Sequence, residues 1–304
     1  MVEPTATGLV VQADERLAGR IRALSRRRMV FFAGLPGTGK SLLVHQLAHL
    51  AAATGRRIHL LQWDVARPVF EISPAGRRYP LVDGVTHPLI RKAAGLWVRR
   101  ALARWSERHP DPTHLLIGET PLVGHRFVEL AHHLPDEAEA LLAAPSCRFV
   151  IAAPSAAVRR FLERERERRS AHPLHPRERE DAPPRVLREL WDDLVRVARQ
   201  LGGPGVGQDS VPYDPVVYAR VYETVLRHRH VEVVGLDVIL PTGRLSAYDF
   251  TVEATDLVPT EAEAAEFIHR VERLAGDAAA LAREVAGWWQ IPGTPLRPPP
   301  PPGS

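Results

Sequence analysis

Residues 34–41 have the spacing that most clearly points to chemistry. They read Gly-Leu-Pro-Gly-Thr-Gly-Lys-Ser and fit the pattern G-x-x-x-x-G-K-[ST] at every fixed position. The glycines let the backbone form a tight concave loop whose N–H groups point inward. Together with the N-terminus of a helix that begins near Gly39, these donors form a site for a polyanion. Lys40 is expected to reach the outer phosphates of a nucleoside triphosphate, and the Ser41 hydroxyl to hold Mg²⁺.

The residues on either side of this loop supply the strand and the helix that the pattern requires. Residues 30–33 are an apolar run typical of a buried strand, and segment 41–53 has leucines at helical spacing. Of the 40 Lys and Arg residues, only Lys40 and Lys92 are lysines, so a compact ammonium is kept where a guanidinium would not fit the loop. We expect the phosphates to be surrounded by Gly34, Leu35, Pro36, Gly37, Thr38, Gly39, Lys40, Ser41 and Leu42.

Asp64 and Arg67 stand where the next predicted strand, 58–63, ends. A carboxylate at the carboxyl edge of a parallel sheet lies near the phosphate loop, where it can accept the proton of a substrate hydroxyl during phosphoryl transfer. Arg67 can then bind a substrate phosphate or carboxylate through two parallel hydrogen bonds. The alternative is a turn aspartate that caps its loop, next to a surface arginine.

Glu119 follows a third apolar strand, within the segment Leu-Leu-Ile-Gly-Glu-Thr. An acid at this place reaches Mg²⁺ directly or through water, so Ser41 and Glu119 are the predicted metal-binding residues. The acid is Glu rather than the more usual Asp, and the alternative is a strand-end acid that caps the next segment. Arg126, seven residues further on, is a weaker candidate for a contact with the substrate.

Arginine and glutamate alternate over residues 159–169, in a predicted helix that begins at about 154. Arg160 and Arg164 are four residues apart and share one face of such a helix. In a lid above the phosphates, arginines stabilise the charge on the transferring phosphoryl group, and we expect Arg160 and Arg164 to do so. The alternative is a solvated helix whose surface ion pairs contribute little.

Predicted strands alternate with predicted helices, which favours an α/β fold with a parallel sheet and helices on both faces. Phosphate chemistry then collects at the carboxyl ends of the strands. Residues 65–85 look irregular because of their prolines and glycine, whereas 88–108, 124–143 and 261–289 are predicted helices. The predicted strands are five: 29–33, 58–63, 113–118, 147–153 and 231–240.

The distance between the last two predicted strands sets the domain organisation. Residues 154–228 exceed one crossover helix and predict a helical insertion that acts as a lid. The whole predicted organisation is an N-terminal helix packed on the core (1–28), the core itself with its insertion (29–255), a C-terminal helix (256–290) and a disordered proline-rich tail (291–304).

The loop resembles that of P-loop NTPases and is similar to versions found in P-loop kinases and AAA-type ATPases. Asp64 and Arg67, one strand later, are similar to the Asp-x-x-Arg of polynucleotide kinases, gluconate-type kinases and zeta-toxin-like kinases. The long insertion resembles the lid of nucleotide and nucleoside kinases. The resemblance covers about residues 29–255 and implies a P-loop kinase-like fold with ATP and Mg²⁺ as cofactors. It also implies a Walker A role for the loop and a Walker B role for Glu119.

Composition limits the remaining possibilities. The chain has 304 residues, of which 45% are hydrophobic and 25% charged, as in ordinary globular proteins. No apolar run approaches a membrane span, residues 1–28 lack a signal peptide, and the single Cys147 excludes an internal disulfide. These features predict a cytoplasmic protein with no membrane partner. A net charge of +4 permits weak attraction to nucleic acid without indicating that it binds.

The sequence therefore predicts an ATP-dependent phosphotransferase that moves the γ-phosphate to a hydroxyl acceptor, which is a small molecule or a polymer. ATP is favoured over GTP because the Asn/Thr-Lys-x-Asp tetrad that reads guanine is absent. Two alternatives stay open: a nucleotide-switched ATPase that acts through a binding partner, and a kinase that acts on nucleic-acid ends. The second should show a steep salt dependence from phosphate contacts.

Overall fold

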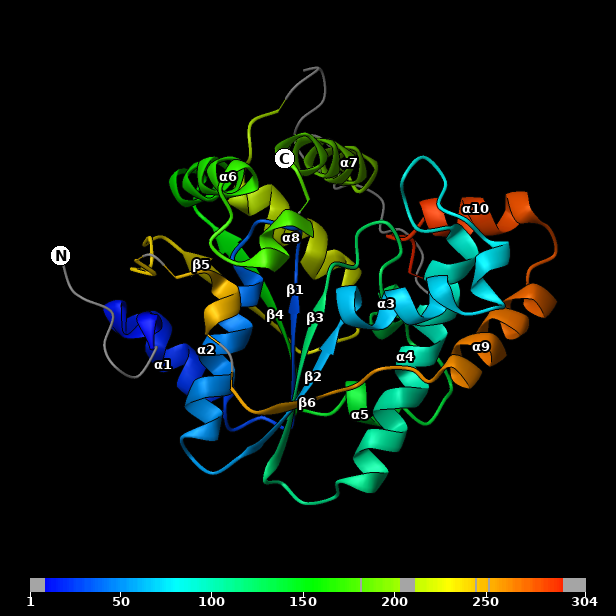
Figure 1. Ribbon diagram of the computed structural model, residues 1–304, viewed down its shortest axis with the longest axis horizontal. Helices are drawn as coiled ribbons and strands as arrows, with labels where there is room; N and C mark the ends of the chain where they lie inside the picture. Colours follow the sequence, from blue (N-terminus) through cyan, green and yellow to red (C-terminus); the bar gives the residue numbers. More distant parts are fainter. Residues whose placement is uncertain (1–8, 181, 203–210, 244, 251, 292–304) are drawn as a thin grey trace, which may run out of the picture.

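The structure, a computed structural model, describes residues 9–180, 182–202, 211–243, 245–250 and 252–291. An all-parallel sheet runs through the centre of the molecule, and its strands follow the spatial order β5-β4-β1-β3-β2-β6 (Figure 1). The predicted α/β class with a parallel sheet is therefore confirmed. The strands are β1 (Met29–Ala33), β2 (Arg57–Gln62), β3 (His114–Thr120), β4 (Cys147–Pro154), β5 (Val231–Leu236) and β6 (Ala254–Asp256).

The sheet has six strands among the described residues, so the prediction of five was wrong. The additional strand, β6, pairs with the outer edge of β2 over three residues. Its sequence Ala-Thr-Asp has no apolar run that could reveal a strand. Short polar strands are common at sheet edges because they discourage further pairing. Strand β5 is also shorter than predicted and ends at Leu236.

Helices cover both faces of the sheet (Figure 1). Side chains alternate along β1, so both faces carry apolar residues that the helices bury. Val30 and Phe32 pack with α1 (Glu15–Leu24) and α2 (Lys40–Ala52) in one hydrophobic cluster. Phe31 and Ala33 point to the opposite face and belong to the larger cluster. That face is covered by α4 (Pro88–Arg108), α8 (Pro215–Val225), α9 (Glu261–Leu274) and α10 (Ala278–Ala286).

The chain leaves the carboxyl ends of β1 and β3 toward opposite faces of the sheet. Strand β1 leads into α2 on one face, whereas β3 leads to the buried residues of the other cluster. In open parallel sheets, ligands bind in the crevice outside neighbouring strands whose connections diverge in this way. The fold therefore provides a binding position beside the loop after β1.

Three predicted segments differ in the structure. Residues 65–85 contain a helix, α3 (Trp63–Ile72), that follows β2 directly and tolerates Pro68 because its apolar face is buried. Most of 124–143 is not helical and holds only short helical turns, among them α5 (Glu139–Leu142), since Leu122, His125 and Phe127 have positive φ angles. Segment 261–289 is two helices, α9 and α10, broken between Leu274 and Ala278.

The segment between β4 and β5 is mostly helical among the described residues. It contains α6 (Ala156–Ala171), α7 (Pro184–Gln200) and α8, and Asp214 caps α8 through the N–H groups of Val216 and Val217. Figure 1 shows α6 and α7 at the end of the sheet toward which the strand arrows point. The predicted disordered tail, 291–304, lies outside the described residues except for Ile291. Within the described chain, no helix combines the length and apolar character needed to cross a bilayer.

Candidate functional site

The loop between β1 and α2 has the backbone that its sequence predicts. Gly39 adopts the left-handed conformation (φ 83°) at the N-cap of α2, and it has no side chain to accept the first N–H groups of the helix. Those N–H groups therefore remain available to an anion. Thr38 braces the loop by donating to the carbonyl of Leu35 (2.9 Å). A Cβ at Gly34 would lie 2.1 Å from the Tyr218 hydroxyl, so only glycine fits there.

Lys40, Ser41 and Glu119 form one contact group at the carboxyl edge of the sheet. Lys40 Nζ lies 3.3 Å from Glu119 Oε1, and Ser41 Oγ donates to Glu119 Oε2 at 3.2 Å. Strand pairing produces this contact, because β3 lies next to β1 and places Glu119 opposite Phe32. A hydroxyl beside a carboxylate offers the hard oxygen ligands that Mg²⁺ prefers.

Lys40 is buried within this group. Its ammonium also donates to the carbonyl of Leu35 (2.8 Å), and its side chain is only 4% exposed. Burial lowers the pKa of Lys40, and the neighbouring Glu119 carboxylate opposes that shift. Since the ammonium is already removed from water, its interaction with an incoming anion would be little screened.

Asp64 lies in the first turn of α3, directly beyond the end of β2. Strand β2 pairs with β3 and sets Gln62 opposite Glu119, so Asp64 comes close to the loop group. Asp64 is exposed at the surface, yet protein atoms surround much of its carboxylate. This partial burial raises the pKa of Asp64, and the negative charge of Glu119 raises it further. A raised pKa brings a carboxylate closer to the range suited to a general base.

Arg67 and Arg126 both lie near Asp64, and their positive charges oppose the rise of its pKa. Arg67 forms an ion pair with Glu71 (2.8 Å), and Glu71 in turn accepts from Thr86 (2.8 Å). Arg126 is on the loop after β3, not at the start of a helix as predicted. The structure therefore places Lys40, Ser41, Asp64, Arg67, Glu119 and Arg126 at one edge of the sheet.

Arg160 and Arg164 lie on the other side of α6. Both are exposed and line an open hollow of about 230 Å³ with Glu163, Glu167 and Arg188. Among the described residues, neither forms a hydrogen bond or ion pair with residues 34–41, and their role in charge stabilisation stays a prediction.

Two other arginines of α6 face the loop in their place. Arg159 is 1% exposed and donates from Nη1 to the carbonyl of Pro36 (3.0 Å), while Glu163 binds its Nε (2.7 Å). Arg166 Nη1 lies 3.4 Å from the position of a Cβ on Gly37. The sequence held a signal for this pair. Arg159 and Arg166 are seven residues apart and therefore share one face of α6, next to the buried Val158.

The helices of the insertion lie directly on the loop between β1 and α2. A Cβ on Gly37 would be 3.2 Å from Leu187 of α7, and Tyr218 of α8 lies against Gly34. Together with Arg159 from α6, these side chains cover the loop from three helices. The helices between β4 and β5 thus contact the loop after β1, and their action as a lid stays a prediction.

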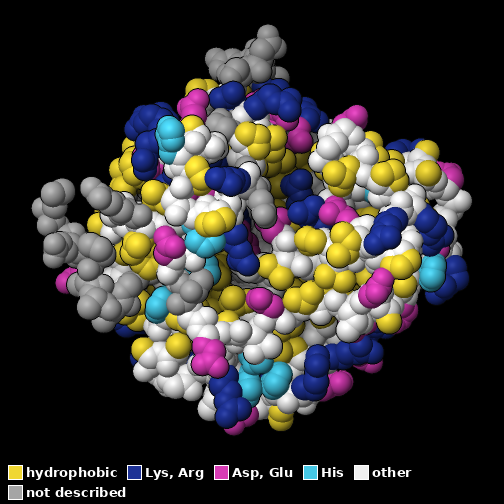
Figure 2. Space-filling model, in the orientation of Figure 1, with side chains coloured by type: hydrophobic (Ala, Val, Ile, Leu, Met, Phe, Trp, Pro, Cys, Tyr) yellow, Lys and Arg dark blue, Asp and Glu magenta, His cyan; other side chains and the backbone are white. Residues whose placement is uncertain are grey.

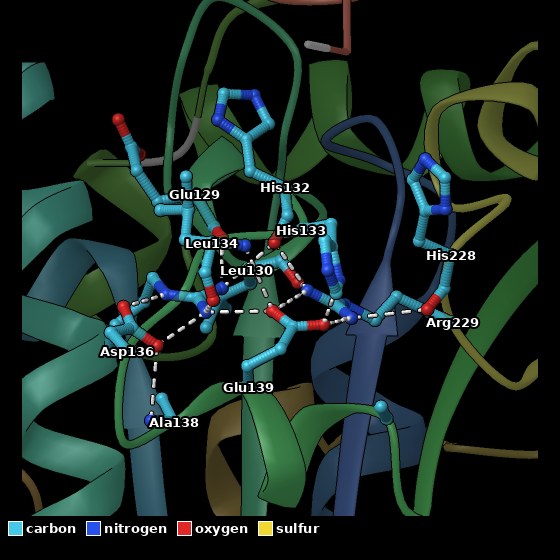
Figure 3. Close-up of polar contacts among 12 residues, drawn as sticks. Glu129, Leu130, His132, His133, Leu134, Asp136, Ala138, Glu139, His228 and Arg229 are labelled. Carbon is cyan, nitrogen blue, oxygen red and sulfur yellow. Dashed lines mark hydrogen bonds and ion pairs between the residues drawn. The ribbon is translucent and has the colours of Figure 1, made fainter. Parts of the chain in front are cut away.

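A buried network of charges supports the loop that carries Arg126. Glu129 is fully buried between Lys92 (3.2 Å) and His125 (2.7 Å). Burial by itself would raise the pKa of Glu129, but its contacts with His125 and Lys92 lower that pKa to about 2. Figure 3 shows the adjoining cluster, in which Glu139 accepts from Arg229. Arg99 Nη2 also lies 2.9 Å from a carboxylate oxygen of Glu139. Sequence reasoning missed this network because its members come from distant segments.

A group of three histidines lies toward the amino ends of β2 and β3, away from the loop after β1. The ligand atoms of His59, His109 and His114 are all within 4.8 Å of one another, and His59 Nε2 contacts His114 Nδ1 at 2.8 Å. Arg28, Arg57 and Arg108 add positive charge around these rings. The positive charge of these arginines opposes the binding of a metal cation. It therefore favours neutral imidazoles, of which His109 and His114 are stacked, over a metal centre.

The fold and the site define an α/β protein with an all-parallel sheet and a glycine-rich loop at its carboxyl edge. Comparison with known protein families, curated proteins and solved structures gave no match for this chain.

Proposed function

We propose that this protein is an ATP-dependent phosphotransferase of P-loop kinase type that transfers the γ-phosphate to a hydroxyl acceptor. The observation that carries the proposal is the meeting of Lys40 and Ser41 at the carboxylate of Glu119, beside the uncapped N-terminus of α2. This set combines N–H donors, one ammonium and hard oxygen ligands. Together they match what a Mg²⁺-bound triphosphate requires.

Each residue of the site has a role in this reaction. The backbone of residues 34–42 and Lys40 bind the phosphates, and Ser41 with Glu119 would hold Mg²⁺, which neutralises charge on the phosphates when bound. The acceptor oxygen forms the new bond to the γ-phosphorus while the bond to the β-phosphate oxygen breaks and ADP leaves with that electron pair. Asp64 takes the proton of the acceptor hydroxyl.

The insertion contributes by covering the phosphates. Leu187 and Arg159 lie against the loop from α7 and α6, so closure of these helices would exclude water from the reacting group. Exclusion of water favours transfer to the acceptor over hydrolysis. Arg159 and Arg166 replace Arg160 and Arg164 as the arginines best placed to approach the γ-phosphate.

The direct test is an acceptor screen with γ-labelled ATP and Mg²⁺. The full chain is incubated with pools of hydroxyl compounds, including sugars, nucleosides, their phosphates and oligonucleotides with free 5′ ends. Label should pass from ATP to one class of acceptor, with one ADP formed for each product. ATP binding without transfer to any pool, together with hydrolysis at an unchanged rate in all of them, would contradict the proposal.

A nucleotide-switched ATPase is the second candidate, and the Arg159 contact with Pro36 favours it. That hydrogen bond joins the insertion to the phosphate-binding loop, so nucleotide exchange at the loop would change how α6 is held. A switch of this kind hydrolyses ATP without an acceptor and does not need Asp64. The two functions therefore differ in the response to replacement of Asp64, which is treated in the Discussion.

A further inference from the structure

Arg91 and Arg126 approach each other on either side of Gly124. A Cβ built on Gly124 would lie 3.6 Å from Arg91 Nη1 and 3.7 Å from Arg126 Nη1. Arg91 comes from the first turns of α4, and Arg126 from the loop after β3, so the tertiary structure alone brings the two guanidinium groups together. Arg91 Nη1 donates to the Gly124 carbonyl at 2.8 Å, which fixes it in this position.

Neither guanidinium group has a carboxylate partner. Within the described part of the chain, no Asp or Glu oxygen lies within 4.0 Å of Arg91 or Arg126, although most arginines packed against the core have one. Arg91 Nε is buried without a hydrogen-bond acceptor, and Arg126 Nη1 makes only a long contact to the carbonyl of Val123 (3.4 Å). Several N–H donors are thus left to bind something else.

Burial makes this arrangement costly without an anion. Burial, with a smaller contribution from the charge of Arg126, lowers the pKa of Arg91 to about 10. Burial also lowers the pKa of Arg126, while Asp64 opposes that shift. Two cations held close together and partly removed from water are stabilised by an anionic group placed between them.

The pair lies beside the residues proposed for catalysis. Arg126 and Asp64 are close enough for each to shift the pKa of the other. Arg67 is also near, but Glu71 already neutralises it. Figure 2 shows Lys and Arg side chains, with Asp or Glu beside them, gathered between α7 and the α3 region of the surface. An anion on Arg91 and Arg126 would therefore place the rest of its molecule near Asp64.

We propose that Arg91 and Arg126 bind a phosphate monoester on the acceptor, so that the substrate is a hydroxyl compound that already carries a phosphate group. This inference rests on the proposed phosphotransferase function. A phosphate monoester has a charge of about −1.5 to −2 at neutral pH and three acceptor oxygens. It therefore balances two unpaired guanidinium groups, whereas a carboxylate would leave one positive charge uncompensated.

The loop that carries Arg126 is built to hold this position. Leu122 and Arg126 exchange backbone hydrogen bonds (3.0 and 3.3 Å), and Thr120 donates to the Arg126 carbonyl at 3.2 Å. His125, on the same loop, is fixed by buried Glu129. Lys92, which binds Glu129, follows Arg91 directly on α4, so the two arginines are positioned through one shared network.

The test measures binding of inorganic phosphate by calorimetry in the Lys40→Ala protein, in which the phosphate-binding loop no longer competes for the anion. Phosphate should bind at one site, and acetate, as the carboxylate probe, should bind more weakly. Arg91→Gln and Arg126→Gln should each weaken phosphate binding by about tenfold or more, since hydrogen bonds to charged groups contribute about 1.5–3 kcal/mol. Arg16→Gln, an exposed arginine on α1, should leave it unchanged.

The outcomes separate this inference from the proposed function. Absence of phosphate binding in Lys40→Ala, or equal phosphate binding after Arg91→Gln and Arg126→Gln in proteins with unchanged circular dichroism, overturns the phosphate site. Acetate binding as tightly as phosphate overturns the choice of a phosphate monoester. Binding of ATP to the parent protein is measured separately. If the parent does not bind ATP while phosphate binds at the two arginines, the phosphotransferase proposal fails and the anion site stands.

Discussion

Lys40 Nζ, at the first residue of α2, lies 3.3 Å from Glu119 Oε1 near the end of β3, and the same ammonium donates to the carbonyl of Leu35 within its own loop. The lysine is thus held by one contact from β3 and one from the loop. A triphosphate at the loop would exchange the Leu35 contact for phosphate oxygens, while Glu119 keeps its contact with Ser41. Under the proposed function, the pair would couple phosphate binding to the oxygens proposed to hold Mg²⁺.

Replacement of Lys40 by alanine should remove most of the affinity for ATP and leave the fold intact. Lys40 is the only Lys or Arg in the sequence of residues 34–42, and its burial gives it a stronger interaction with phosphate than a surface cation would have. Calorimetry with Mg²⁺ and ATP is the measurement, with circular dichroism to verify the fold. Equal ATP affinity in variant and parent would remove the phosphate-loop assignment.

Asp64→Asn should keep nearly the full ATP affinity and lower the rate of phosphoryl transfer by about 10²–10⁴-fold. The amide has the same shape but cannot take a proton from the acceptor hydroxyl. Binding of ATP is compared by calorimetry, and transfer is measured with labelled ATP and the acceptor found in the screen. Transfer at the parent rate would show that Asp64 is not the base, and the switch candidate would then be the better account.

Closure of the insertion should be visible in hydrogen exchange. Amides of α6 (Ala156–Ala171) should exchange more slowly when an ATP analogue and Mg²⁺ are added, because Arg159 links this helix to the phosphate-binding loop through Pro36. Arg159→Gln should reduce the slowing without abolishing ATP binding. If exchange throughout α6 is the same with and without nucleotide, the insertion does not act as a lid.

Stability should fall as the pH drops from about 6.5 to about 4. Burial, with smaller effects of neighbouring positive charges, lowers the pKa of His59 to about 4, and burial also lowers that of His132 to about 4. Between these values the unfolded chain binds protons that the folded chain does not, so acidification favours unfolding. Thermal melts across this range are the measurement, and His59→Gln should flatten the dependence. A constant melting temperature from pH 7 to 4 would show that these imidazoles are not held neutral.

Gly95→Ala should be strongly destabilising, because a Cβ at this place would lie 1.6 Å from Glu129 Oε2. The collision would displace a buried carboxylate that holds His125 and Lys92, and breaking such buried pairs costs roughly 3–5 kcal/mol. Gly19→Ala on α1 is the matched control, since nothing lies within 4 Å of its Cβ. The control should gain about 0.5–1 kcal/mol. Urea unfolding measures both, and equal stability of the two variants would contradict the account of the network.

Local sequence determined the parts of this protein that depend on neighbouring residues. The strand, loop and helix over residues 29–53 and the helix near the N-terminus were readable because each follows from residues close together in the sequence. The alternation of strands and helices also predicted a parallel sheet, since parallel strands require crossover connections.

Only the tertiary structure decided which arginines meet at the site. Arg159 and Arg160 are adjacent in sequence and equally basic, yet the direction in which α6 leaves β4 turns the first toward Pro36 and the second toward solvent. The same holds for Arg91 and Arg126, which meet because β1, β3 and α4 pack around one core. The pKa of an arginine or a carboxylate at such positions depends on its burial and on its charged neighbours. Strand order decides both, and the spacing of residues along the chain does not reveal them.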